Sequence, residues 1–129
     1  ALYGVVLRDE VVDAEATRAR RGAIRSERLG GRTPKADPPE GNGLAAVCPA
    51  IDQAKRFRCL CGADLGPATE TWKPRASRRT VPPQAFGPHI TLHAELELRE
   101  FCCSECGTLL ETEVARRGQD SLASIVLDT

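Results

Sequence analysis

The sequence lacks methionine and any long apolar run, and it contains few aromatic residues and few lysines. Because methionine is absent, Ala1 is not an initiator residue, and we expect a start that was processed off or left out. Without a run of about 18 apolar residues, a membrane-spanning helix is excluded. No signal-peptide pattern opens the sequence.

The formal net charge is also zero, because 18 basic residues balance 18 acidic ones. A dedicated nucleic-acid binder needs excess basic charge to neutralise phosphates, so this balance argues against that class. The only lysines are Lys35, Lys55 and Lys73. Arginine supplies the other cations, and its forked hydrogen bonds to carboxylates suit protein interfaces. The charge pattern therefore favours a protein partner.

Aromatic residues are scarce, with one tryptophan, one tyrosine and three phenylalanines among 129 residues. A chain of this length can form one modest domain with an arm, or two very small units. Small units with thin cores usually need a metal, disulfides or a partner for stability.

The N-terminal residues predict an arm made of a strand and a helix. Residues 1–7 have the composition of a short buried strand. A helix should run from Ala14 to Leu29, with Asp13 as its N-cap and two glycines ending it. Its apolar stripe is thin, and arginines cover much of the remaining surface: Arg18, Arg20, Arg21, Arg25 and Arg28. Such a helix cannot fold alone and needs a docking surface.

A stretch rich in proline and glycine follows at residues 30–50 and predicts an extended linker, with plain disorder as the alternative. The expected division is a partner-docking arm at 1–31, a linker at 32–54 and a β domain at 55–129.

The β domain is expected to begin with a strand at 56–59. Residues 73–89 are expected to be irregular, because four prolines interrupt them. Strict alternation of apolar and polar residues predicts a half-buried antiparallel strand at 90–99. Further strands are expected at 108–115 and 122–127. The expected fold class is α+β, with a strand-helix arm and a small antiparallel zinc-ribbon-like domain.

Six cysteines are present, an even number that could form disulfides in a secreted protein. Their spacing favours a metal instead, because a C-x-C pair and a C-x-x-C pair each present two thiolates from a tight turn. A glycine follows each pair, at Gly62 and Gly107, where unusual backbone angles are needed. The expected zinc ligands are Cys59, Cys61, Cys103 and Cys106. Four thiolates leave no open coordination position, so the zinc should be structural.

Alternatives for these cysteines are unmetallated buried thiols or a redox pair. Cys102 should point away from the site, and Cys48 lies in the linker as a stray thiol. His89 and His93 are expected to be solvated or interface residues. The four thiolates and zinc carry a net charge of about −2, which Arg58 could partly offset. We expect no catalytic residue and no cofactor-binding residue, because no catalytic set or phosphate-binding loop is present.

Residues 58–118 resemble the small gamma subunit of acetone carboxylases and the small subunit of acetophenone carboxylase. The segments that carry this resemblance are Arg58-Cys59-Leu60-Cys61-Gly62, Trp72-Lys73, Leu98-Arg99-Glu100-Phe101 and Cys103-Ser104-Glu105-Cys106-Gly107-Thr108-Leu109-Leu110 with the residues to Val114. Two positions depart from the family pattern: Ser104 replaces a frequent proline, and Ala63 replaces a common histidine. Neither change removes an expected ligand.

The N-terminus resembles, over a shorter length, the C-terminal tail of hydantoinase B-type subunits, through residues 3–7 and 12–21. This likeness implies an acetophenone carboxylase-like arrangement, in which the arm completes the fold of a large subunit. The arm is therefore expected to dock on that partner rather than on its own zinc domain.

The resemblance implies a subunit of an enzyme that converts a ketone, bicarbonate and ATP to a β-keto acid. ATP and a divalent metal would bind to large hydantoinase A-like and hydantoinase B-like subunits in the cytoplasm, and this chain would be structural. The alternatives are a free-standing zinc-ribbon nucleic-acid-binding or adaptor protein and, more remotely, a thiol redox protein.

Overall fold

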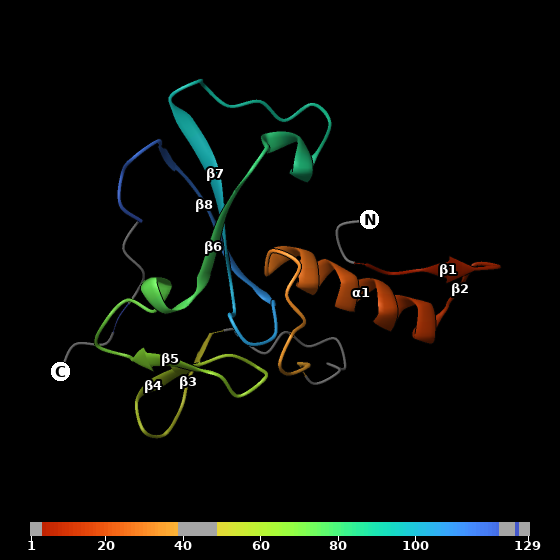
Figure 1. The fold of residues 1–129 in the computed structure, drawn as a ribbon, viewed down its shortest axis with the longest axis horizontal. Helices are drawn as coiled ribbons and strands as arrows, with labels where there is room; N and C mark the ends of the chain where they lie inside the picture. The colour runs from red at the N-terminus through yellow and green to blue at the C-terminus, as the bar shows by residue number, and fades with distance from the viewer. Residues whose placement is uncertain (1–3, 39–48, 122–125, 127–129) are drawn as a thin grey trace.

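The computed structural model describes residues 4–38, 49–121 and 126 of the chain. These residues form one α-helix, two short 3-10 helices and three small antiparallel sheets (Figure 1). The fold class is therefore α+β, as the sequence predicts.

The arm begins with a two-stranded hairpin, β1 (Leu7–Arg8) and β2 (Val11–Val12). Asp9 and Glu10 form its turn with φ values of 52° and 64°, the backbone that a two-residue hairpin turn requires. The expected buried strand over residues 1–7 is wrong for its described part, because only Leu7 pairs and its side chain is 64% exposed. Residues 1–3 lie outside the described residues.

The helix α1 (Ala14–Arg28) agrees with the sequence prediction to within one residue. Asp13 caps it by accepting a hydrogen bond from the Ala16 amide at 2.9 Å. Gly30 and Gly31 end it with φ values of 71° and 90°, which side chains with a Cβ rarely adopt.

The last turn of α1 packs against the chain's own β domain. Arg79 donates to the Glu27 carbonyl at 3.4 Å, and Arg28 donates to the Gly107 carbonyl at 3.5 Å. The expectation that the arm docks away from its own domain is wrong for this end of the helix, because these arginines find acceptors within the chain. The β1–β2 hairpin, in contrast, extends away from the sheets (Figure 1).

The second sheet has the order β3-β4-β5. Its strands are β3 (Ala50–Ile51), β4 (Arg56–Arg58) and β5 (Asp64–Pro67). The strand expected at 56–59 is therefore present as β4, and it leads directly into the first cysteine pair. The described part of the linker also has a fixed contact, because the Lys35 amide donates to the Glu105 carbonyl at 2.7 Å.

The third sheet has the order β6-β7-β8. Its strands are β6 (Ser77–Val81), β7 (Leu96–Cys102) and β8 (Leu109–Arg116). The short helices η1 (Lys73–Arg75) and η2 (Pro83–Phe86) precede and follow β6.

Two strand predictions in this region are corrected. The stretch 73–89 is not wholly irregular, since it contains β6. The strand expected at 90–99 begins only at Leu96, because residues 90–95 have no paired neighbour. β6 ends at Val81, because Pro82 and Pro83 follow it and proline has no N–H to donate to a neighbouring strand. β8 ends at Arg116. The strand expected at 108–115 is confirmed as β8. Of the strand expected at 122–127, only Val126 lies within the described residues, and it is not in a strand.

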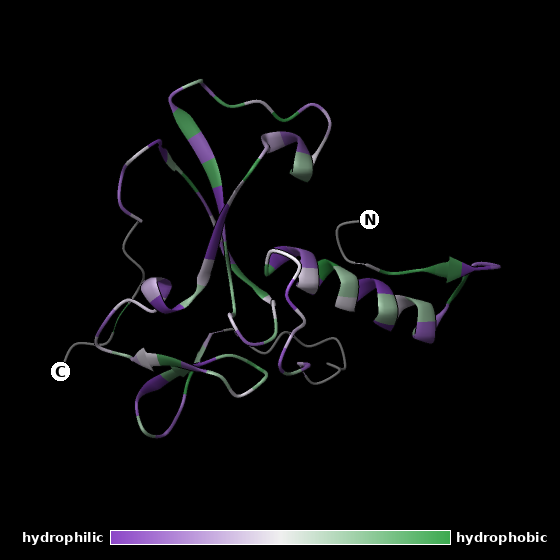
Figure 2. Ribbon diagram, in the orientation of Figure 1, coloured by the Kyte–Doolittle hydropathy of each residue, from purple (hydrophilic) through white to green (hydrophobic). Residues whose placement is uncertain are grey.

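Both faces of β7 are covered, which explains why five consecutive residues from Leu98 are buried. One face carries Glu100 and Cys102 toward α1. The other carries Arg99 and Phe101, and Phe101 joins the core around the cysteines. Hydrophobic and hydrophilic residues alternate along the first part of β7 in Figure 2.

Candidate metal centre

The first cysteine pair sits in a tight turn between β4 and β5. The Cys59 amide donates to the Ala63 carbonyl at 3.1 Å, and the Gly62 amide donates back to the Cys59 carbonyl at 2.9 Å. Gly62 has φ of 92°, so the glycine after the pair performs the turn that the sequence predicts.

The second pair sits in the turn between β7 and β8 and repeats this pattern. The Cys103 amide donates to the Thr108 carbonyl at 2.9 Å, and the Gly107 amide donates to the Cys103 carbonyl at 2.8 Å. Gly107 has φ of 77°. Each turn thus holds the sulfur atoms of its two cysteines within 4.8 Å of each other.

The two turns bring the four sulfur atoms together. All four Sγ atoms of Cys59, Cys61, Cys103 and Cys106 lie within 4.8 Å of one another. Across the turns, the Cys59–Cys106 and Cys61–Cys103 sulfur pairs are each 3.7 Å apart. A zinc ion with bonds of about 2.3 Å would hold its tetrahedral sulfurs about 3.8 Å apart. A disulfide would need about 2.05 Å. The spacing therefore suits a tetrahedral metal and not a disulfide.

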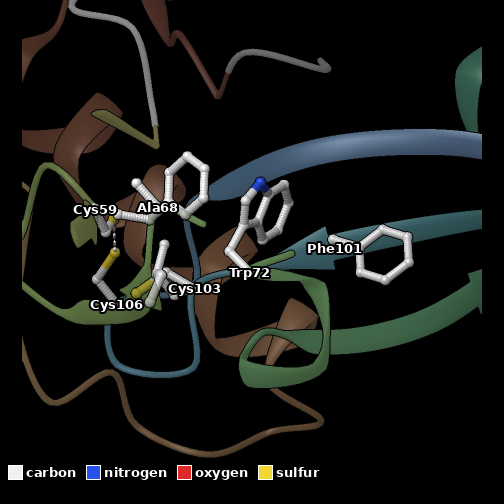
Figure 3. Close-up of a cluster of buried hydrophobic side chains, with 8 residues drawn as sticks. Cys59, Ala68, Trp72, Phe101, Cys103 and Cys106 are labelled. Carbon is white, nitrogen blue, oxygen red and sulfur yellow. Dashed lines mark hydrogen bonds between the residues drawn. The ribbon is translucent and has the colours of Figure 1, made fainter. Parts of the chain in front are cut away.

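The cluster is part of the hydrophobic core. Cys103 and Cys106 have no exposed surface and Cys59 is 4% exposed, whereas Cys61 is half-buried. In the view of Figure 3, the Trp72 side chain lies between the Phe101 ring and the cysteine sulfurs, and all belong to one core cluster. Their rings meet edge to face at 6.1 Å between centroids. A metal held here would be shielded from water on most sides.

The buried thiols share protons unevenly. Donation to Cys106 raises the pKa of Cys103 to about 12. Hydrogen bonds from Cys103 and Cys59 lower the pKa of Cys106 well below its ordinary value. Cys106 also contacts the Thr108 hydroxyl at 3.0 Å, a neighbour that the sequence analysis did not single out. A metal ion binds thiolates and displaces the thiol protons, so the metal affinity of such a site decreases as the pH falls.

Cys102 does not join the cluster, in agreement with the sequence prediction. Burial raises the pKa of its thiol to about 11, so it stays protonated at neutral pH. Cys48 lies outside the described residues. His89 and His93 are exposed, and neither belongs to the group of four cysteines.

Comparison with known families decides what this cluster belongs to. The profile of the acetone carboxylase gamma subunit matches residues 44–128, which is more than half of the chain and includes both cysteine pairs. The chain belongs to the acetone carboxylase gamma subunit family. It is thus a small subunit of a carboxylase assembly, and other carboxylase subunits are its partners. No curated protein matches the chain. Among the described residues, no helix combines the length and apolar character that crossing a membrane requires.

Both residues of the Trp72-Lys73 pair of this gamma-family chain are buried, and each makes a different kind of contact. Trp72 packs in the core, while Lys73 is 3% exposed and lies 5.1 Å from the centre of the Phe101 ring. Its ammonium pairs with Glu111 and, at 2.9 Å, with Glu113. Burial disfavours the charge, but these two carboxylates outweigh it and raise the pKa of Lys73.

Arg99 extends this buried network along β7. It is 1% exposed and pairs with Glu97 at 2.7 Å and with Glu113 at 3.3 Å. It also donates to the carbonyls of Arg116 and Gln119 at 3.0 and 2.7 Å. The alternation at 90–99 places Arg99 among the polar positions of its strand. The structure instead buries it, because acceptors surround every edge of the guanidinium.

Arg58 makes the local contacts expected of a residue beside the first turn. It donates to Asp52 at 2.9 Å and to the Gly62 carbonyl at 3.3 Å. The hydrogen bond from Arg58 lowers the pKa of Asp52. The guanidinium thus offsets the Asp52 carboxylate.

Proposed function

We propose that this chain is the non-catalytic zinc subunit of an ATP-dependent ketone carboxylase of the acetophenone carboxylase type. The observation that carries the proposal is the buried group of four sulfurs at tetrahedral spacing, in a chain of the gamma subunit family. The complete enzyme would convert a ketone, bicarbonate and ATP to a β-keto acid.

The proposed ligands of the zinc are Cys59, Cys61, Cys103 and Cys106. Four thiolates fill the tetrahedron, so the ion would have no position for water or substrate. It would serve to join β4 and β5 to β7 and β8 through the two turns. Structural zinc contributes about 10–16 kcal/mol in small model sites, more than a core this poor in aromatic residues can supply.

The chemistry would take place on the partners. We assign ATP and a divalent metal to hydantoinase A-like and hydantoinase B-like large subunits in the cytoplasm, where thiols stay reduced. The proposed division is an arm at 1–31, a linker at 32–54 and a zinc domain at 55–129, with the end of the linker contributing β3 to the first sheet of the zinc domain. The arm would contact a large subunit through its hairpin, where Leu7, Val11 and Val12 are 64%, 68% and 55% exposed.

Co-expression of the chain with the two large subunits tests this proposal. The purified assembly should contain the chain with one zinc per copy, whereas the chain alone should not hydrolyse ATP. The variant Cys103→Ala should lose the zinc, and Cys102→Ala, its neighbour outside the cluster, should keep it. A chain that purifies without the large subunits, or a Cys103→Ala variant with unchanged zinc, would rule the proposal out.

A further inference from the structure

A groove with a volume of about 680 Å³ lies between α1 and the sheet β6-β7-β8, bordered by η2. Arginines dominate its lining: Arg20, Arg21, Arg25, Arg28 and Arg79. Among the described residues, two acidic ones, Glu27 and Glu100, line the same groove. The chain as a whole is electrically neutral, so this excess of positive charge is local.

Among the described residues, these two carboxylates form no close ion pair with Arg25 or Arg28. Glu100 pairs closely with Arg79, at 2.9 Å, but stands 3.9 Å from Arg28. Arg25 is only 14% exposed, and within the described residues its Nε has no hydrogen-bond partner. That Nε is itself buried, so an incoming group would not reach it, but the positive charge of this largely desolvated guanidinium favours a negatively charged group in the groove.

A carboxylate of the chain itself already occupies one edge. Asp37 accepts a hydrogen bond from Arg25 at 2.7 Å while its side chain remains 81% exposed. Exposed ion pairs contribute little, about 0–1 kcal/mol, so another carboxylate could join or replace Asp37 there at small cost.

Part of the groove lining is apolar, since it includes Ile24, Phe86 and Leu109. A small anion would use the charge but leave these side chains uncovered. An extended peptide with acidic residues beside an apolar side chain would use both. The groove also lies on the helix whose other end carries the exposed hairpin, so one partner could contact both (Figure 1).

We propose that this groove binds an acidic segment, with an apolar anchor residue, of a large carboxylase subunit. The inference rests on the proposed function, since it needs such a partner. The attraction would come from Arg20, Arg25 and Arg28, and the apolar anchor would sit against Ile24 and Phe86.

The test measures the dissociation constant between the full chain, loaded with zinc, and the co-purified large subunits. Arg20→Glu reverses an exposed charge in the groove, and Arg25→Gln removes the forked donor. Arg116→Glu makes the same charge change as Arg20→Glu at an exposed position of β8 outside the groove. We expect Arg20→Glu to weaken binding about tenfold or more at low salt, and Arg25→Gln to act in the same direction. The Arg116→Glu variant should bind like the unaltered chain.

Ionic strength gives a second readout. Binding of the unaltered chain should weaken as salt rises, and this dependence should be smaller for Arg20→Glu. If the unaltered chain binds the large subunits and Arg20→Glu and Arg25→Gln bind equally well, the groove is not the docking site, although the proposed function stands. If the unaltered chain does not bind them, both the proposed function and this inference are wrong. If inorganic phosphate binds the isolated chain and Arg20→Glu abolishes only that binding, the ligand is a small anion and the inference is again wrong.

Discussion

Replacement of Lys73 by methionine offers the sharpest test of the energetics of this fold. The ammonium lies at 3% exposure between Glu111 and Glu113 and above the Phe101 ring. Methionine fills a similar volume without the charge. The Glu113 carboxylate, itself 3% exposed, would then lose its 2.9 Å salt bridge with Lys73 and keep its 3.3 Å salt bridge with Arg99.

Removal of one partner from a buried ion pair costs about 3–5 kcal/mol, because the other charge remains desolvated. Since Arg99 still contacts Glu113, we expect about 3 kcal/mol, at the lower end of that range. With a urea dependence of about 1–2 kcal/mol per molar, the unfolding midpoint should fall by about 2 M. The assay is urea unfolding of the zinc-loaded chain, followed by tryptophan fluorescence.

Lys35→Met is the matched control, because Lys35 pairs with Glu105 at 4.0 Å with side chains 73% and 44% exposed. An exposed pair should contribute less than about 1 kcal/mol. Equal midpoint shifts for the Lys73 and Lys35 variants would refute this reasoning.

Three further predictions follow from the same structure. Gly107→Ala should destabilise the chain more than Gly62→Ala, by about 1–3 kcal/mol. Both glycines have positive φ, so backbone strain is common to the two variants. An added Cβ at Gly107 would lie 2.5 Å from the Arg25 carbonyl oxygen, whereas at Gly62 it would meet open space. Equal urea midpoints for the two variants would contradict the packing of α1 on the second turn. The raised pKa of Lys73 means that its stabilising effect is complete below its ordinary value of 10.5 and is lost as pH rises through the raised value. The difference in unfolding free energy between the unaltered chain and Lys73→Met should therefore be constant from pH 8 to 10 and shrink above that range; a difference that already shrinks below pH 9 would argue against the shift. Finally, a zinc chelator should shift the emission of the single tryptophan, which lies in the same core as the cysteines, to longer wavelength, and unchanged emission after verified metal removal would disprove a structural ion.

Local signals in the sequence predicted the local parts of the molecule. The cysteine pairs with their following glycines, and the helix with its Asp13 cap, depend on residues within a few positions of one another. Such features can be read from spacing alone. The four sulfurs could be grouped because zinc chemistry supplies the missing long-range constraint.

Features that depend on distant partners could not be predicted in this way. The alternation at 90–95 looked like a strand, but strand limits depend on where neighbouring strands end. The burial of Lys73 depends on Glu113, 40 positions away. The docking of α1 depends on contacts such as that of Arg28 with Gly107, 79 positions away. Nothing in the spacing of these residues records such pairs.

The position of the cysteine pairs also bears on how the chain would respond to cleavage. One pair lies in the turn before β5 and the other in the turn before β8, while the mostly exposed, unpaired residues 88–95 lie between them in the sequence. A protease that cuts in this loop would produce two pieces, each of which carries two thiolates. A bound ion would hold the pieces together as a clasp. Once the metal is withdrawn, the pairing of β6 with β7 and the side-chain contacts across the cut would alone join the two fragments, so the nicked protein should then separate at a lower urea concentration than the uncut protein.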